Sequence, residues 1–226
     1  MCTPEELLGP LNEVERKYAP PTLFVAGEPE ILTNGGRVSI VGSRKASRES
    51  LARVGQLAKI LVERGHVVVS GLAAGIDTAA HRAAIAAGGK TIAVIGTPLD
   101  KMYPSENAAL QAEIMREHLC ISQFPSGYPI QPKNFPMRNR TMALVSDATV
   151  IIEAGQTSGS LSQGWEALRL GRSLFISQWL TKEKDLTWPA EMLKYGARVL
   201  SNETLDELLE ELPDRHGTLV LDELSI

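Results

Sequence analysis

The chain has 226 residues, of which 43% are apolar, and a formal net charge of -4 at pH 7. This length can bury one sizeable core, and the mild acidity excludes a generally cationic nucleic-acid binder, so any polyanion site must be a local basic patch. The sequence has no apolar run long enough to cross a membrane and no signal-peptide pattern, so we expect a cytoplasmic protein without membrane contact.

The N-terminal stretch, residues 1–36, predicts a short helical extension and a lead-in to the main domain. Thr3 and Glu6 have the spacing of a capping box, and the helix they begin is expected to run to about Tyr18. Residues 22–26 suit a short strand. We expect this stretch to pack against the main domain.

Residues 37–200 alternate between apolar runs and helical segments. This alternation favours an α/β fold, with a mainly parallel sheet covered by helices on both faces. Residues 201–226 predict an acidic C-terminal helix, expected over 202–211, and a tail. The expected strands are 38–41, 66–70, 91–95, 119–122, 148–153, 173–177 and 198–200.

Three expected strands end in turns of glycine and small residues, at 42–47, 71–77 and 155–160. Carboxyl ends of parallel strands meet at one edge of the sheet, so these turns can build one crevice. In the first turn Ser43 offers a hydroxyl and Arg44 a fork of donors beside a helix start, which suits a phosphate. A surface turn with incidental charge remains the open alternative.

Residues 124–146 contain four prolines, at 125, 129, 132 and 136, and predict a long loop. Phe135 lies among cations there, which is how proteins stack a nucleobase while holding its phosphates. Alternatively, Phe135 anchors the loop to the core and the arginines bridge structural elements. If 37–48 and 126–146 meet at the sheet edge, a basic groove would result from Arg37, Arg44, Lys45, Arg48, Lys133, Arg138 and Arg140.

The sequence lacks the glycine-rich nucleotide-binding patterns and the nucleophile elbow of common enzyme classes. Asp77 and His81 are four residues apart on one expected helix and could ligate a metal, but no third ligand has a suitable spacing. We expect Asp77 to cap that helix and pair weakly with His81. No metal, cofactor or catalytic residue is therefore expected.

Several long motifs, in order, make the chain resemble the DNA-processing protein A (DprA/Smf) family from about Leu23 to Leu200. The resemblance implies a Rossmann-like domain that binds single-stranded DNA, forms homodimers, protects incoming DNA and helps load a RecA-type recombinase in natural transformation, without an established catalytic step. It rests on VGSRKAS (41–47), SGLAAGIDTAAH (70–81), IGTPLDKMYPSEN (95–107), NFPMRNR (134–140) and SGSL (158–161). The DNA-binding residues it implies are Arg44, Lys133, Phe135, Arg138 and Arg140, followed by Ser43, Asn139, Gly159 and Ser160.

Two other functions remain open. The chain also resembles LOG-type phosphoribohydrolases, which cleave nucleoside monophosphates: Arg138 and Met142 keep a spacing of that family, and Glu166 follows Gly159 by seven residues, where a catalytic glutamate would lie. The P-G-G and G-T elements of those enzymes are absent. The third candidate is a nucleotide-sensing module that uses the same crevice without catalysis.

Overall fold

The structure, a computed structural model, describes residues 1–213. Its centre is an eight-stranded sheet in the order β1-β5-β4-β3-β2-β6-β7-β8, in which all neighbouring strands are parallel except β1 and β5. The strands are β1 (Phe24–Gly27), β2 (Arg37–Gly42), β3 (Val67–Ser70), β4 (Thr91–Ile95), β5 (Leu119–Ser122), β6 (Ala148–Glu153), β7 (Ser173–Ser177) and β8 (Arg198–Leu200).

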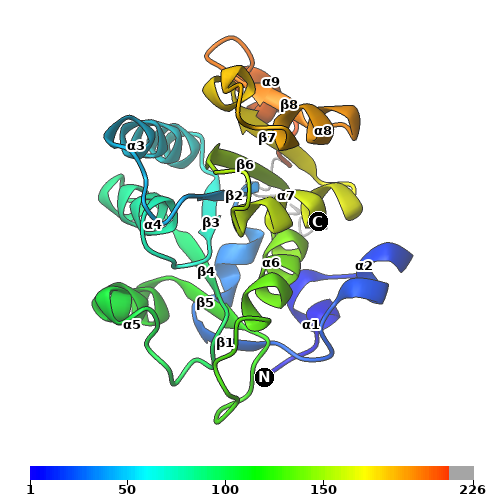
Figure 1. The fold of residues 1–226 in the computed structure, drawn as a ribbon. Coiled ribbons are helices and arrows are strands. Elements are labelled where there is room, and N and C mark those ends of the chain that lie inside the picture. The colour runs from blue at the N-terminus through cyan, green and yellow to red at the C-terminus, as the bar shows by residue number, and fades with distance from the viewer. Residues whose placement is uncertain (214–226) are drawn as a thin grey trace, which may run out of the picture.

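Helices cover both faces of this sheet, with α3, α4 and α5 on one face and α6 and α7 on the other (Figure 1). The predicted three-layer α/β fold is therefore confirmed. No helix within residues 1–213 is both long enough and apolar enough to span a bilayer. The helices are α1 (Pro4–Leu8), α2 (Glu13–Tyr18), α3 (Arg48–Glu63), α4 (Ile76–Ala86), α5 (Ala108–Glu117), α6 (Asn134–Val145), α7 (Ser160–Arg169), α8 (Trp188–Lys194) and α9 (Leu205–Glu210), with short 3₁₀ segments at Pro29–Thr33, Ser105–Asn107 and Gln178–Lys182.

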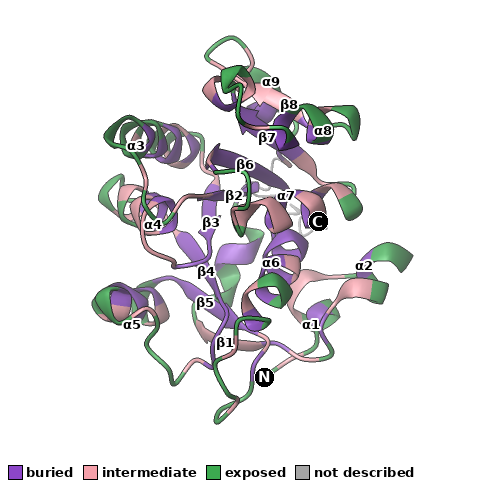
Figure 2. Ribbon diagram, viewed as in Figure 1, coloured by how far each residue is buried: buried purple, intermediate pink, exposed green. Residues whose placement is uncertain are grey.

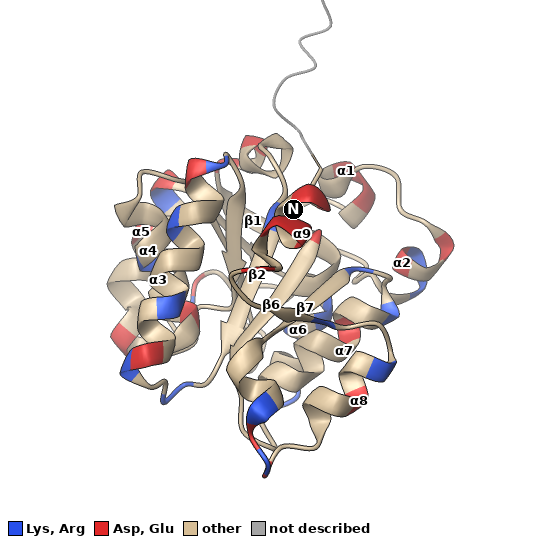
Figure 3. Ribbon diagram, turned by 90° about the horizontal axis from the view of Figure 1, so that it is seen from above, with Lys and Arg blue, Asp and Glu red and all other residues tan. Residues whose placement is uncertain are grey.

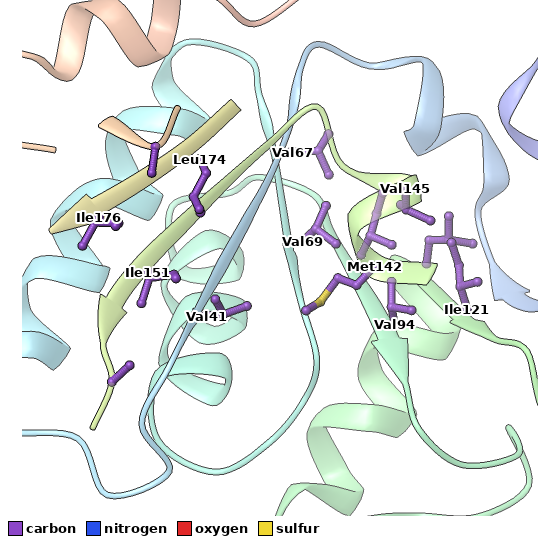
Figure 4. Packing of buried hydrophobic residues seen from close by; sticks show 14 of the residues in the cluster. Val41, Val67, Val69, Val94, Ile121, Met142, Val145, Ile151, Leu174 and Ile176 are labelled. Carbon is purple, nitrogen blue, oxygen red and sulfur yellow. The ribbon is translucent and has the colours of Figure 1, made fainter. Parts of the chain in front are cut away.

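The central strands are buried on both faces because successive side chains point into opposite layers. Figure 2 shows this burial along the sheet and on the inward sides of the helices. On the α6 face, Met142 and Val145 pack in one cluster with Val69, Val94 and Ile121 (Figure 4). This packing fixes α6 across the sheet, from Phe135 beside Gly96 at the carboxyl edge to Val145 near the amino edge.

Residues 124–146 are not one long loop, as predicted from their prolines, because α6 begins at Asn134. Pro136 lies in the first turn of α6, where a missing backbone N–H removes no hydrogen bond within the helix. From Arg138 to Val145 all but Arg140 are buried, so the helix has no solvent-facing stripe that would mark it in the sequence.

The N-terminal extension consists of two short helices, whereas one helix was predicted. Gly9, with a positive φ of 86°, ends α1, and Asn12 and Glu15 form a second capping box that starts α2. The predicted strand follows as β1, which pairs antiparallel with β5 and lengthens the sheet.

At the other end of the chain, Leu208 and Leu209 of α9 pack with Val38 and Phe175 against the α3 face of the sheet. In Figure 3, the acidic residues of α9 lie toward the end where the strands begin. The domain boundaries after residues 36 and 200 stay a prediction, and the part of the predicted tail from 214 to 226 lies outside the described residues.

Candidate nucleic-acid interface

The strand order reverses between β2 and β6, since the chain builds β3, β4 and β5 on one side of β2 and then crosses to β6, β7 and β8 on the other. Ligands of open parallel sheets bind at such a switch point, outside the carboxyl ends of the strands. A cavity of about 670 Å³ lies there, between the β2–α3 turn, the start of α6 and the β6–α7 loop. Its size is typical of a small-ligand site.

A second hollow of about 360 Å³ adjoins the first and lies between the β3–α4 turn, the end of β4 and residues 102–106. Arg44, Phe135 and Arg138 line both hollows, so they form the ridge between them. We call the two hollows together the cleft. The predicted meeting of the GSR turn and the NFPMRNR segment at the sheet edge thus occurs.

In the GSR turn, Ser43 makes hydrogen bonds within the protein, whereas the cations that follow it are exposed to solvent. Ser43 Oγ accepts a hydrogen bond from the backbone N–H of Lys45 at 3.1 Å, and the carbonyl of Ser43 accepts one from the N–H of Ile76 at 3.1 Å. Arg44 and Lys45 are exposed at the mouth of the cleft. No described carboxylate pairs with either cation, so both are available to a phosphate.

Phe135 is half-buried and has the anchoring role considered for it, while stacking on a nucleobase stays a prediction. Its ring packs on Gly96, where a Cβ atom would lie 2.8 Å from Cδ1, so the ring anchors α6 to the end of β4. The ring centroid of Tyr103 is 5.7 Å away, and the Arg44 guanidinium lies 5.8 Å above the ring. An aromatic platform with a cation at its face is thus present within the cleft.

Arg138 is the buried member of the ridge. Its Nη1 donates to the carbonyl of Val94 at 3.0 Å and lies 4.0 Å from Oδ2 of Asp77. A Cβ atom at residue 71 would lie 1.3 Å from Nη1, so any residue other than glycine there would displace the guanidinium. Burial lowers the pKa of Arg138 and raises that of Asp77, while each charge opposes the shift of the other. No described residue accepts a hydrogen bond from Arg138 Nε.

Both expectations for Asp77 are wrong, since it neither pairs with His81 nor caps α4, whose N-cap is Gly75 without a side-chain cap. Asp77 accepts from the N–H groups of Gly71 and Ala73, at 3.2 and 3.4 Å, whereas His81 Nδ1 is 2.7 Å from Thr91 Oγ1 behind β3. Burial, helped by nearby positive charge, lowers the pKa of His81 to about 3. Within residues 1–213 no group of His, Cys, Asp and Glu has the arrangement of a metal site.

Asn139 ties the α7 loop to α6. Its Nδ2 donates to the carbonyl of Gly159 at 3.2 Å and to Ser162 Oγ at 2.5 Å, while Ser160 Oγ is 2.6 Å from Ser158 Oγ. Neither α6 nor α7 has a side-chain N-cap, and residues of both first turns line the larger hollow. Two positive helix ends therefore face the cleft and favour an anion.

Four of the seven predicted cations line neither hollow of the cleft: Arg37, Arg48, Lys133 and Arg140. Lys133 is exposed just before α6, and Arg140 turns away from the cleft. Arg37, which the sequence placed in the basic groove, is buried at the start of β2 and pairs with Asp147 at 3.1 Å. That expectation is wrong for Arg37, because it lies at the opposite edge of the sheet from Arg44.

Glu166, the candidate catalytic carboxylate, is buried and lines neither hollow. Its carboxylate pairs with Arg140 at 3.4 Å and Arg169 at 2.8 Å, and both guanidinium groups lie over the ring of Tyr18 from α2. Since two cations neutralise it away from the cleft, its position does not suit a ribosyl centre bound there.

Sequence reasoning missed Gln163, whose Nε2 donates to Ser39 Oγ at 3.2 Å beneath the larger hollow. No described residue donates to its Oε1, which leaves an acceptor at the cleft. It also missed Tyr103, although Tyr103 belongs to the long 95–107 motif. No motif signals Gln163, since its role depends on how α7 packs over β2 and β6.

These features define a Rossmann-like α/β protein with a cleft lined by cations at its switch point. Among solved structures, DNA processing protein A from Streptococcus pneumoniae aligns over 87% of this chain and 71% of its own, with a TM-score of 0.77 and 34% identity. A structure of DNA processing protein A from Helicobacter pylori is described for its single-stranded DNA binding mode. It aligns over 89% of this chain and 94% of its own, with a TM-score of 0.78 and 27% identity.

The molybdenum cofactor binding protein from Rippkaea orientalis aligns over 77% of this chain and 95% of its own, with a TM-score of 0.55 and 19% identity. At that identity the similarity concerns the fold alone. The Rossmann-like arrangement is therefore shared with proteins of other function, and the family must be identified from sequence.

The family model for DNA recombination-mediator protein A matches residues 4–213, and the chain belongs to this family of DNA-processing proteins. It is 34% identical to DNA processing protein DprA from Bacillus subtilis over 88% of this chain and 67% of that protein. It is 43% identical to the DprA of Streptococcus pneumoniae over 70% of this chain and 55% of that protein. It is 35% identical to Protein Smf from Escherichia coli over 85% of this chain and 51% of that protein. The chain thus spans between half and two thirds of the length of these relatives.

Proposed function

We propose that the chain binds single-stranded DNA in the cleft, without sequence preference and without catalysis. The observation that carries this proposal is the convergence of Arg44, Phe135 and Arg138 on one ridge at the switch point. Membership of the family and the likeness to the Helicobacter pylori structure support it.

Phosphate binding follows from the exposed cations and the helix ends. Arg44 and Lys45 offer charge at the cleft mouth, and the starts of α6 and α7 add the positive ends of two helix dipoles. Lys133, exposed at the start of α6, is placed to meet the strand outside the hollows. Ser43, Asn139, Gly159 and Ser160 shape the two loops between which the backbone would lie.

Base contacts follow from the aromatic side chains. Phe135 and Tyr103 offer ring surface at the smaller hollow, and every base has a face that can stack on a ring. Ring contacts of this kind do not read base edges. We therefore expect binding to be nearly indifferent to sequence.

Fluorescence anisotropy with a labelled oligothymidylate at two salt concentrations tests this function. Tight binding is expected to weaken with salt and to be competed poorly by duplex DNA. Arg44→Ala should lower the affinity about tenfold and reduce the slope of log K against log salt by about 0.7, the contribution of one single-strand phosphate contact.

Arg64→Ala is the matched control, because Arg64 is exposed at the far end of α3 and lines neither hollow. Equal behaviour of the two variants would contradict the assignment of the cleft. Competition by a nucleoside monophosphate, with no binding of the strand, would favour the nucleotide-sensing function. Release of base from that nucleotide would favour the phosphoribohydrolase.

Beyond binding, we propose that the protein shields incoming strands, helps load a RecA-type recombinase and acts as a homodimer. Family membership supports these roles. Nuclease protection of a bound strand and the nucleation rate of recombinase on it test the first two, and light scattering after size exclusion tests the third. Unchanged protection and nucleation, and a monomer mass, would contradict them.

A further inference from the structure

A separate cavity of about 400 Å³ lies at the carboxyl ends of β6, β7 and β8, between α3 and the segment that follows β8. It shares no lining residue with the cleft. Its apolar surface includes Leu57, Ile152 and Leu200. The cavity therefore lies at the same sheet edge as the cleft.

An aromatic ring in this cavity is held in place and carries a cation. Trp179 Nε1 donates to the carbonyl of Ile152 at 3.0 Å, which fixes the indole against the end of β6. The guanidinium of Arg53, from α3, lies 5.7 Å from the indole ring. A planar group that enters the cavity would thus meet an indole and a guanidinium, which both stack on heteroaromatic rings.

The polar groups of the cavity are mainly neutral amides and hydroxyls. The amides of Gln56, Gln178 and Asn202 and the hydroxyls of Ser177 and Ser201 line it. Amides offer both donors and acceptors, as a nucleobase edge requires. Glu203 also lines the cavity, so a phosphate would be repelled from its interior while an uncharged base would not.

The start of α3 runs between the cleft and the cavity. Ser47, the N-cap of α3, donates from its N–H and Oγ to Glu153 at the end of β6, at 3.0 and 2.9 Å. Arg53 follows six residues later, about 9 Å along the helix axis. Lys45, Arg48 and Arg53 are all exposed on this path, so phosphates between the two sites would pass cations.

We propose that this cavity binds a nucleobase of the same DNA strand that occupies the cleft, a few nucleotides further along. The inference rests on the proposed function, and it adds a second base subsite built by Trp179 and Arg53. This second subsite makes the affinity for DNA depend on strand length, because a short strand fills only the cleft.

Photocross-linking of the full chain to oligonucleotides that carry 5-iodouracil at successive positions tests the subsite directly. Cross-links to Trp179 are expected at positions a few nucleotides away from those that label Phe135 or Tyr103. In parallel, Arg53→Gln should lower the affinity for strands of roughly 16 nucleotides about tenfold. It should leave the affinity for strands of roughly 4 nucleotides unchanged. Arg64→Gln, on the same helix, should change neither.

Cross-links confined to the cleft, with unchanged affinity of Arg53→Gln at every length, would overturn the subsite while the cleft assignment stands. If no strand binds, the proposed function fails, and free 5-iodo-2′-deoxyuridine monophosphate is then applied alone. Labelling of Trp179 by that nucleotide would overturn the strand as occupant, and no labelling would overturn nucleobase binding altogether.

Discussion

Arg138 and Arg140 are two residues apart on α6, and each lies near a buried carboxylate, yet their surroundings differ. The Arg138 side chain is 7% exposed and lies beneath the cleft, 4.0 Å from Asp77. The Arg140 side chain is 41% exposed and pairs with Glu166 on the flank that faces α2. Residues two apart on a helix point about 200° apart around its axis, which places the two cations on opposite sides of α6.

This difference shows that a positive charge within a motif need not contact a polyanion. Arg140 shares Glu166 with Arg169, and both guanidinium groups lie over Tyr18, so Arg140 holds the N-terminal helices to the domain. Arg138 faces the cleft but is partly compensated by Asp77. The uncompensated positive charge at the cleft comes from Arg44, with Lys45 beside it.

Arg138→Leu should have the largest effect, lowering the free energy of unfolding by about 3–5 kcal/mol, because it leaves the Asp77 carboxylate buried without a cation. Arg140→Leu should lower it by about 1 kcal/mol or less, since Arg169 still pairs with Glu166 and the site is partly exposed. Urea unfolding measures both. Recovery of stability in the double variant Arg138→Leu/Asp77→Asn, which removes the charge and keeps an acceptor for Gly71 and Ala73, is the control. Equal losses in the two single variants would refute the comparison.

Acid should reveal the state of His81, which lies behind the cleft. The folded protein does not protonate His81 until pH about 3, whereas the unfolded chain does so from the ordinary value of 6.5. The unfolded state therefore binds the extra proton as pH falls through this window, and stability drops by about 1.4 kcal/mol per pH unit. A neutral His81 also adds no positive charge beside Arg138.

The measurement is urea unfolding of the wild type and His81→Gln between pH 6.5 and 4.5. The difference between the two free energies of unfolding should shrink as pH falls, because only the wild type loses this contribution. Parallel curves would mean that His81 is protonated in the fold and that the region beneath the cleft carries two cations.

The strands could be predicted from sequence because runs such as 67–70 are valine-rich and bounded by glycine. Helix α6 could not, since its buried residues from Arg138 onward face the sheet, α7 and the N-terminal helices at once. Hydrophobic periodicity requires one solvent face, and α6 lacks it. The sequence therefore favoured a loop where a helix begins at Asn134, because prolines occur at 125, 129, 132 and 136.

The cleft shows the same limit. The position of Arg44 at the sheet edge was predictable, because a glycine turn after a buried strand places it there. The same strand separates Arg37, at its start, from Arg44 by about 20 Å. The pairing of Arg138 with Asp77 was not predictable, since it depends on how α6 packs over the β3–α4 turn. Gly71 leaves space for the guanidinium, and this role can be recognised only once the packing of α6 is known.

Phe135→Ala tests whether the ridge between the hollows acts by stacking. We expect single-stranded DNA affinity to fall about tenfold, with little change in the slope of log K against log salt, because loss of a ring releases no counterions. Phe135→Trp should restore most of the affinity. A slope that falls as in Arg44→Ala would instead mean that the ring serves to hold the Arg44 guanidinium, 5.8 Å above it.

The smallest effect on DNA binding is expected for Arg140→Gln. Its cation pairs with Glu166 on the flank opposite the cleft, so affinity should change by less than about twofold and the salt slope not at all. Limited proteolysis within residues 1–20 should instead become faster, because one of the two cations over Tyr18 is lost. A salt slope reduced by about 0.7 would show that Arg140 leaves Glu166 to meet a phosphate, and the two arginines of α6 would then act on the same strand.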